Sequence, residues 1–214
     1  MTRVLIVGAG GFGREVLEWL RSATTPEGFE VGGFLDDNAD ALRGYERSLG
    51  VVGGISDYEP LPDEVLVMGI GQVRAKLACA EKLLARGARF TSLVHSTAYV
   101  GSTVKLGVGC VICPYACITC DVQVGDFVIL NVAASVGHNA TIGDGCTLNG
   151  HCDINGGASI GRGVLVGTHA CVLPGVRVGD FATIGAGSAV IKPVAERTTV
   201  VGVPARRIAL PSGH

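Results

Sequence analysis

Residues 124–148 read VGDFVILNVAASVGHNATIGDGCTL, and every sixth position in this stretch carries an aliphatic side chain. The same period continues in both directions without an insertion and covers seventeen consecutive hexads. The fifth position of each hexad is small or β-branched, and the second position is often glycine. The aliphatic positions are Val94, Val100, Leu106, Ile112, Ile118, Val124, Leu130, Val136, Ile142, Leu148, Ile154, Ile160, Val166, Val172, Val178, Ile184 and Val190.

A period of six fits neither the 3.6-residue repeat of a helix nor a long alternating strand. It is typical of a parallel β-helix, in which each hexad forms a short strand and a corner. Three hexads make one triangular coil, so each residue should stack above the residue three hexads earlier in the sequence. The seventeen hexads therefore predict between five and six coils, a prism roughly 27 Å long at a strand spacing of about 4.8 Å.

The residues before the hexads predict a βαβ-type domain of about 90 residues. Apolar runs at residues 3–7, 29–35, 51–52 and 65–70 predict strands, and residues 90–94 are expected to close the sheet. Helices are expected after residue 13 and over residues 73–85, the second with Leu77, Ala80, Leu83 and Leu84 facing inward. We therefore expect a Rossmann-like domain over 1–92, an all-β domain over 93–195 and a C-terminal cap over 196–214.

The loop GAGGFG at residues 8–13 lies between the first strand and the first helix. Such a loop presents bare amides and a helix N-terminus to an anion, which favours a nucleotide diphosphate. Asp36 ends the next strand, where an acid that binds ribose would lie, so NAD is a further possibility. A purely structural turn is the third interpretation, and a domain of this size is small for a whole dinucleotide fold.

The composition argues against two classes of protein. The 214 residues carry a net charge of −2 and no basic block, so we expect no nucleic-acid partner. The sequence contains no run of about 20 apolar residues, so we expect no membrane span and a cytoplasmic location. The eight cysteines should then be thiols. The spacing of four of them could suggest zinc, but the hexads place them at different corners and faces, so no metal is expected: Cys110, Cys113, Cys117 and Cys120.

The hexads, the terminal segment Gly202-Val203-Pro204-Ala205 and the GAGGFG loop together resemble one family. The chain is similar to the PglD/NeuD-type nucleotide-sugar acetyltransferases of bacterial glycan synthesis, which include bacillosamine and perosamine N-acetyltransferases. The resemblance implies a left-handed parallel β-helix, a homotrimer, and acetyl-CoA bound between neighbouring coils. It also implies that the N-terminal domain holds a nucleotide-linked amino sugar, whose amine is acetylated. Two alternatives stay open, O-acetylation of a sugar such as a sialic acid and a non-catalytic β-helix scaffold.

The family's catalytic base is a His in an A-S-V-x-H context, which corresponds here to His138. The resemblance assigns the amide of Gly156, one coil further along, to the thioester carbonyl. Some members carry Glu directly after this His, whereas this chain has Asn139, a neutral amide that supports an imidazolium less strongly. Asp144 and Asp153 are therefore candidates for orienting the ring. Cys120 stands one coil earlier, but the family expectation is direct transfer without an acyl-cysteine.

The remaining site residues follow from matching positions. Contacts with acetyl-CoA are expected at Thr147, Thr168 and Ala186. Many members have His where this chain has Phe12, so the diphosphate contact here is expected to rest on backbone amides. His151 and His169 are three hexads apart in the sequence and should stack, but the neighbouring rungs supply no third metal ligand. The residues expected to bind the nucleotide sugar are Gly10, Gly11, Phe12, Asp36, Asp37 and Gly71.

Overall fold

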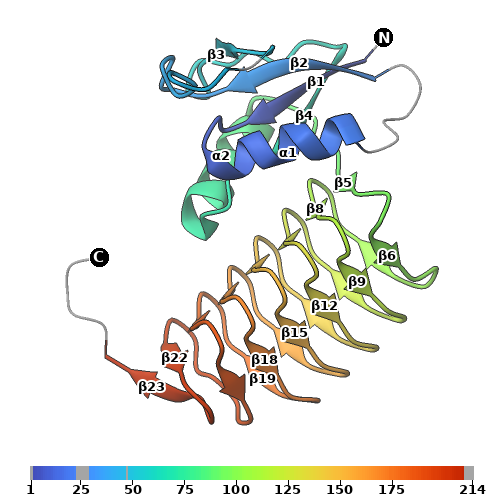
Figure 1. Cartoon of the computed structure of the whole chain (residues 1–214), viewed down its shortest axis with the longest axis vertical. Coiled ribbons are helices and arrows are strands. Elements are labelled where there is room, and N and C mark those ends of the chain that lie inside the picture. The colour runs from blue at the N-terminus through green and yellow to red at the C-terminus, as the bar shows by residue number, and fades with distance from the viewer. Residues whose placement is uncertain (1, 23–28, 47, 210–214) are drawn as a thin grey trace.

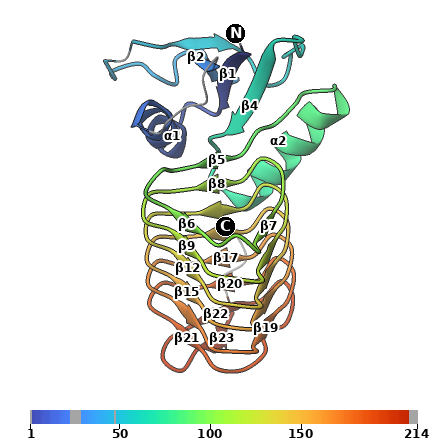
Figure 2. The same cartoon turned by 90° about the vertical axis from the view of Figure 1, so that its right-hand side faces the viewer.

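The computed structural model describes residues 2–22, 29–46 and 48–209, so the last five residues of the expected cap lie outside the described part. An N-terminal α/β domain stands on the first coils of a three-sided parallel β-helix (Figures 1 and 2). This arrangement confirms the fold class expected from the hexads and from the βαβ pattern.

The N-terminal sheet contains four parallel strands in the order β3-β2-β1-β4. Because the strands are parallel, their carboxyl ends meet at one edge of the sheet, and the order changes direction between β1 and β4. The expected strand over residues 90–94 does not close this sheet. Phe90 forms a single bridge with Leu66, and the next strand already belongs to the β-helix. The elements are β1 (Thr2–Val7), α1 (Gly11–Ser22), β2 (Phe29–Leu35), β3 (Val51–Gly53), β4 (Glu64–Met68) and α2 (Val73–Ala85).

Helix α1 begins directly on the glycine loop because Gly13 allows a close approach. A Cβ atom on Gly13 would lie 1.9 Å from the carbonyl oxygen of Gly8, so no larger residue fits there. The helix buries Val16, Leu17 and Leu20 against the sheet. The loop is therefore held at the carboxyl edge of the sheet.

The β-helix consists of strands that form three faces, and each strand has two residues except the last two, which have three. The first face contains β5, β8, β11, β14, β17, β20, β22 and β23, the second β6, β9, β12, β15, β18 and β21, and the third β7, β10, β13, β16 and β19. Partners along each face are three hexads apart in the sequence through β21, as in the pair Ile129 and Thr147. The seventeen strands are β5 (Leu93–Val94), β6 (Tyr99–Val100), β7 (Lys105–Leu106), β8 (Val111–Ile112), β9 (Cys117–Ile118), β10 (Gln123–Val124), β11 (Ile129–Leu130), β12 (Ser135–Val136), β13 (Thr141–Ile142), β14 (Thr147–Leu148), β15 (Asp153–Ile154), β16 (Ser159–Ile160), β17 (Leu165–Val166), β18 (Cys171–Val172), β19 (Arg177–Val178), β20 (Thr183–Ile184) and β21 (Ala189–Val190).

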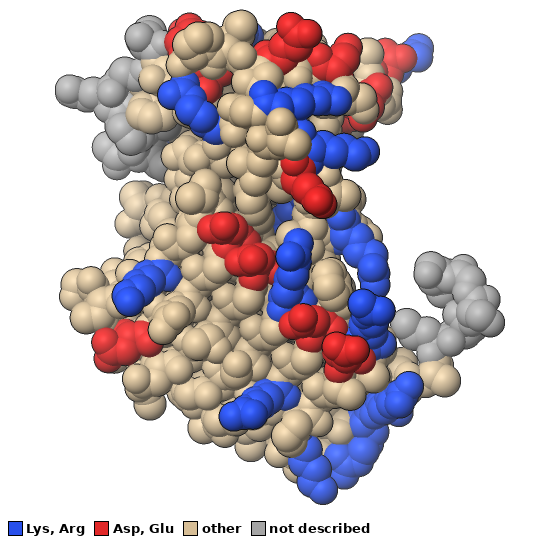
Figure 3. Space-filling view, turned by 180° about the vertical axis from the view of Figure 1, so that it is seen from behind, with Lys and Arg blue, Asp and Glu red and all other residues tan. Residues whose placement is uncertain are grey.

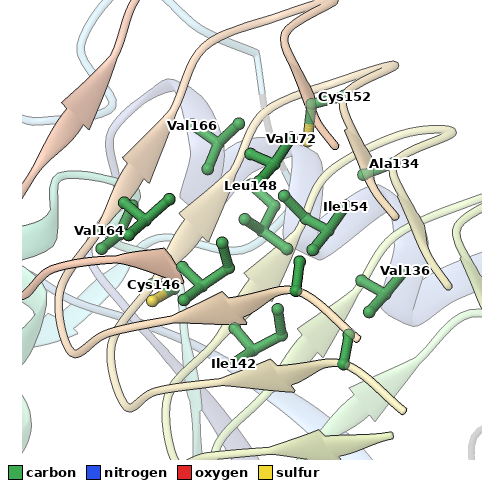
Figure 4. Close-up of a cluster of buried hydrophobic side chains, with 14 of the residues drawn as sticks. Ala134, Val136, Ile142, Cys146, Leu148, Cys152, Ile154, Val164, Val166 and Val172 are labelled. Atoms are coloured by element: carbon green, nitrogen blue, oxygen red, sulfur yellow. The ribbon is translucent and has the colours of Figure 1, made fainter. Parts of the chain in front are cut away.

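The interior of the prism is filled by the aliphatic residues of the hexads and by the small residues at the fifth positions. Side chains from all three faces converge there, as Figure 4 shows for Val136, Ile142 and Leu148. All three are at most 3% exposed. The last coil is followed by β22 (Thr199–Val201) and β23 (Arg206–Ile208), which pair antiparallel.

Helix α2 lies between two partners, the N-terminal sheet and the β-helix (Figure 2). The expectation for its inward face was partly wrong. Leu84 is 45% exposed, whereas Lys76 is fully buried and Cys79 is buried. A helix covered on two sides buries a wider stripe than the simple amphipathic pattern indicates. The polar end of Lys76 is buried because the second partner, the β-helix, supplies oxygen acceptors.

Candidate functional site

His138 lies in the corner between the second and third faces, directly after β12. Its side chain is exposed, and its Nδ1 lies 2.9 Å from Oδ1 of Asn139. Because the amide oxygen can only accept, Nδ1 must carry the proton, which leaves Nε2 with a free lone pair. Asn139 adopts a φ of 61° in this corner, and its backbone N–H donates to the carbonyl of Cys120, 3.1 Å away. The ring is thus oriented by a residue whose own backbone is anchored to the previous coil.

Gly156 lies directly next to the free edge of this imidazole. A Cβ atom on Gly156 would be 2.7 Å from Nε2 and 2.7 Å from Cε1 of His138, so only glycine leaves the ring in this position. The carbonyl of Gly156 accepts from the N–H of Gly175 at 3.0 Å. Its own N–H has no acceptor among the described residues. An imidazole with a free Nε2 and an available amide donor therefore lie side by side at one corner.

Neither candidate carboxylate contacts His138 within the described part of the chain. Asp144 stands at a different corner, between the third and first faces, where its Oδ1 accepts from the N–H of Asp126 at 2.9 Å. Asp153 lies on the second face and accepts from the hydroxyl of Ser135 at 2.5 Å. Asn139 is therefore the residue that orients the ring.

The two aspartates at the end of β2 are held by neighbouring loops. Asp36 accepts from the N–H of Ala9 in the glycine loop at 2.8 Å and from the N–H of Asn38 at 2.9 Å. Asp37 accepts from both the N–H and the hydroxyl of Ser56, each at 2.7 Å. The hydrogen bond from the Ser56 amide is the main cause that lowers the pKa of Asp37. Both side chains are thus fixed as acceptors of hydrogen bonds.

A cavity of about 690 Å³ opens between the end of β2 and the segment after β3. Its lining includes Asp36, Asp37, Val52, Gly54 and Asp57. The volume lies within the range of about 300–1,000 Å³ that is usual for small-ligand sites. Its position at the carboxyl ends of parallel strands is where open α/β sheets bind ligands.

The glycine loop and the end of β4 lie beside one another. The ring of Phe12 would be 3.8 Å from a Cβ on Gly71, and it packs edge-on against Trp19 with centroids 5.7 Å apart. A Cβ on Gly10 would meet nothing within 4 Å, and one on Gly11 would meet only the end of an arginine side chain. Both glycines therefore leave open space above the start of α1.

The three residues expected to contact acetyl-CoA lie in two different places. Thr168 and Ala186 occupy the corner between the first and second faces, one coil apart. The rings of His151 and His169, at the same corner, stack with centroids 4.9 Å apart and an interplanar angle of 9°. Thr147 instead lies on the first face and is only 4% exposed. Its hydroxyl lies beneath α2 and is already hydrogen-bonded to Lys76 and Gly71, so this position does not support the expected contact with acetyl-CoA.

In one chain, the two halves of the candidate site are apart. The N-terminal domain packs on the first face through Val111, Ile129 and the residues around Thr147. His138 lies at the corner between the second and third faces, which in a three-sided prism is opposite the first face. The structure therefore brings Asn139 and Gly156 to His138, but it does not bring the residues of the glycine loop there.

Two residues near the site were missed by the sequence reasoning. Arg14 lies with its guanidinium carbon 3.9 Å from the centroid of the Tyr45 ring, and its Nη1 donates to the carbonyl of Ala9 at 3.2 Å. Lys76 is buried where α2 meets β14. No local pattern indicates either contact, although a lysine on an otherwise apolar helix stripe is a weak signal.

The cysteines are buried thiols in most cases. Burial raises the pKa of Cys146 to about 12 and that of Cys110 to about 11, so both stay protonated at neutral pH. Cys120 is exposed. Among the described residues, no group of three or more metal-ligating side chains comes together.

The outer surface of the described chain carries charges of both signs. Figure 3 shows acidic and basic side chains interspersed on one face and basic ones gathered beside the last coils. There, Lys192, Arg206 and Arg207 line a groove of about 410 Å³. None of the helices in the described ranges has the length and apolar character that a bilayer span requires.

Comparisons with known proteins found matches to both the N-terminal domain and the β-helix. Residues 3–83 match the family described as the PglD N-terminal domain. The acetyltransferase domain of PglB from Neisseria gonorrhoeae FA1090 is similar in structure, with a TM-score of 0.88 and 26% identity over 97% of this chain and 100% of that chain. PerB from Caulobacter crescentus, solved in complex with CoA and GDP-perosamine, gives a TM-score of 0.87 and 28% identity over 98% of both chains.

WeeI from Acinetobacter baumannii AYE is also similar, with a TM-score of 0.83 and 26% identity over 97% of this chain and 100% of that chain. These similarities extend over both the N-terminal domain and the β-helix. The resemblance to PglD-type acetyltransferases that the sequence indicates is therefore confirmed.

Proposed function

We propose that this protein is an acetyl-CoA-dependent N-acetyltransferase that acts on the amino group of a nucleotide-linked amino sugar. The observation that carries the proposal is the His138 ring, fixed through Nδ1 by Asn139 with its Nε2 edge against Gly156. The similarity to PerB, whose structure contains CoA and GDP-perosamine, supports the choice of substrates. We place the reaction in the cytoplasm, in the synthesis of bacterial surface glycans.

The proposed reaction is a direct transfer. The sugar amine attacks the thioester carbonyl of acetyl-CoA, and Nε2 of His138 takes the proton that the amine loses. A new C–N bond forms, the C–S bond breaks, and the thiolate of CoA leaves and takes up the proton that His138 received from the amine. The N–H of Gly156 donates to the oxygen that becomes negative in the tetrahedral intermediate. This hydrogen bond lowers the activation free energy by roughly 3 kcal/mol.

The amide side chain of Asn139 supports this base by orientation more than by charge. Its oxygen accepts from Nδ1–H and so favours the tautomer with a basic Nε2. A carboxylate in the same place would also stabilise the imidazolium that forms after proton transfer. Because Asn139 is neutral, we expect this enzyme to depend more than an enzyme with Glu at this position on the acceptor amine being partly deprotonated in solution.

The active site is proposed to be shared between copies in a homotrimer. His138 and the nucleotide pocket lie on opposite sides of the prism in one chain, so one chain alone does not supply both. A neighbouring copy could place its N-terminal domain beside this corner. Acetyl-CoA would then lie between neighbouring coils, with Thr168 and Ala186 as proposed contacts. The proposed nucleotide contacts are Gly10, Gly11, Phe12, Asp36, Asp37 and Gly71.

An assay of free-thiol release tests the proposal directly. The purified protein is incubated with acetyl-CoA and amino sugars linked to GDP, UDP or dTDP, with the matching hydroxy sugars and a free sialic acid as controls. We expect release of CoA with one of the amino sugars. Release only with a hydroxyl acceptor would replace the proposal by O-acetylation, and no release with any acceptor would favour a scaffold.

A further inference from the structure

One buried lysine of α2 forms hydrogen bonds with the β-helix. The Nζ of Lys76 donates to the carbonyl oxygen of Cys146 at 3.0 Å and to the hydroxyl oxygen of Thr147 at 2.9 Å. The hydroxyl of Thr147 donates in turn to the carbonyl oxygen of Gly71 at 2.9 Å. Lys76 is fully buried and Thr147 is 4% exposed. These bonds join the β-helix to the turn between β4 and α2.

The direction of the hydrogen bonds among Lys76, Thr147 and Gly71 follows from the number of protons that each group carries. A hydroxyl has one proton, so Thr147 uses it for Gly71 and can only accept from Lys76. The carbonyl of Cys146 also accepts from the N–H of Ile129 at 2.9 Å within the strand ladder. Loss of the amine would therefore leave Cys146 paired, but it would remove the donor that fixes the Thr147 hydroxyl.

The described structure shows two acceptors for Nζ, which match the two N–H bonds of a neutral amine. Burial, the main cause, lowers the pKa of Lys76 to about 7, with the thiols of Cys146 and Cys110 nearby. A polar group this deeply buried is costly unless it is hydrogen-bonded. Its presence here is therefore explained only by the bonds that it makes across the two parts of the chain.

An apolar side chain of α2 also packs against the β-helix beside these hydrogen bonds. Leu77 lies directly over Gly145, where a Cβ would be 2.4 Å from its Cδ2 atom. Gly145 also has a φ of 67°, which disfavours any other residue. The register of α2 on the β-helix is thus specified twice, once by hydrogen bonds and once by close packing.

Gly71 connects this contact to the edge of the sheet where the nucleotide sugar is proposed to bind. It follows β4 at the carboxyl edge of the sheet, and a Cβ on it would face the ring of Phe12 in the glycine loop. The hydrogen bonds from Lys76 Nζ through the nearly buried Thr147 hydroxyl to the Gly71 oxygen connect this edge of the sheet to β14.

We propose that the hydrogen bonds from Lys76 through Thr147 to Gly71 hold Gly71 against Phe12 of the glycine loop, beside the proposed nucleotide pocket, and that Lys76 is thus a positioning residue for the nucleotide sugar. This role rests on the proposed function, since it assigns the pocket to a nucleotide sugar. Neither Lys76 nor Thr147 needs to touch a ligand to act in this way.

The test compares Lys76→Met and Thr147→Val with two matched variants. Thr147→Ser keeps the hydroxyl, and Lys105→Met makes the same change at an exposed lysine of β7. We expect Lys76→Met and Thr147→Val each to raise the KM for the nucleotide amino sugar about tenfold while kcat and the KM for acetyl-CoA stay within twofold. Thr147→Ser and Lys105→Met should behave as the unchanged protein.

The double variant provides a second check, because residues of one hydrogen-bonded chain do not act additively. Lys76→Met combined with Thr147→Val should exceed the more impaired single variant by no more than about twofold in KM. Equal effects on kcat and on both KM values would mean that the link only stabilises the fold, and that result would overturn the positioning role.

Hydrogen exchange separates this proposal from the proposed function. In the ligand-free protein, amides of residues 69–74 should exchange at least tenfold faster in Lys76→Met and in Thr147→Val, with the β-helix strands unchanged. Unaltered exchange in both variants would overturn the link, whatever the protein acetylates. If no amino sugar is acetylated, the affinity for GDP measured by calorimetry replaces KM, and an affinity unchanged by both substitutions also overturns it.

Discussion

At the scale of single residues, the pair His138 and Asn139 carries the proposed chemistry. His138→Ala should lower kcat roughly 10²- to 10⁴-fold at pH 7, the usual range for loss of a general base. The fold should survive because the side chain is exposed. The loss should shrink as the pH rises to 9, since an amine already deprotonated in solution needs no base. Rates measured between pH 6 and 9 check this.

Asn139→Ala is the matched control for that measurement. It removes the acceptor of Nδ1–H but leaves the imidazole in place, so its effect on kcat should be smaller than that of His138→Ala. Wild-type rates for His138→Ala at pH 7 would show that the ring positions the acceptor and does not take its proton. A loss that stays constant up to pH 9 would indicate a hydroxyl acceptor instead.

Gly156 is the second residue with a specific expectation. In Gly156→Ala, the new methyl group would lie 2.7 Å from Nε2 and Cε1, so the imidazole must turn away. Because the group that moves is the end of a flexible, exposed side chain, the free energy of unfolding should change little. The kcat should fall about 10- to 100-fold. Gly50→Ala, where a Cβ would meet nothing within 4 Å, is the control for the substitution itself. A fully active Gly156→Ala would argue against the proposed contact of this corner with the thioester.

At the scale of elements, the docking of α2 predicts a pH dependence of stability. The folded pKa of Lys76 is lowered to about 7 from the usual lysine value of 10.5. Between these values, the unfolded chain binds a proton that the folded chain does not, so stability rises with pH, by at most about 1.4 kcal/mol per pH unit. Below pH 7 both states are protonated and this gain is absent.

Urea unfolding at pH 7 and pH 9 measures this effect. The free energy of unfolding of the wild type minus that of Lys76→Met should increase by roughly 2 kcal/mol between the two values. The buried thiols of Cys110 and Cys146 act in the opposite direction at still higher pH, because their pKa values are raised to about 11 and about 12. The difference between the two proteins removes their common contribution. A difference that does not change with pH would show that Lys76 stays charged in the folded protein.

At the scale of the whole molecule, the opposite positions of His138 and of the proposed nucleotide pocket predict a shared active site. Large apolar side chains are exposed on the first coils, with Tyr99 63%, Val108 51% and Tyr115 68% exposed, which suits burial against another copy. Light scattering should return three times the chain mass of 21.9 kDa. A stable, active monomer would contradict this arrangement.

Mixing two inactive variants tests the shared site more strictly. We expect His138→Ala and Asp36→Ala to lose activity for different reasons, the first in the base and the second in the nucleotide pocket. In trimers assembled from equal amounts of both, about a quarter of the interfaces would combine an intact His138 with an intact pocket. Recovered activity near that fraction supports the shared site, whereas sites built within one chain would recover none.

The sequence by itself determined the β-helix, because the hexad period is a local property that repeats in every coil. The aliphatic first positions and small fifth positions specify which side chains point inward, and the coil of three hexads places Gly156 next to His138 without further information. The strand, glycine loop and helix of the N-terminal domain follow from equally local patterns. The contact between His138 and Asn139 needed only two neighbouring residues.

Only the tertiary structure decided how these two parts meet. The apolar pattern of α2 does not say that a second partner covers it, so the burial of Lys76 and Cys79 and the exposure of Leu84 were not foreseen. For the same reason, matching positions could not show that α2 covers Thr147. A repeat makes all faces of a prism nearly alike in sequence. The face that carries the N-terminal domain is therefore selected by long-range contacts, such as Leu77 on Gly145, that no local pattern records.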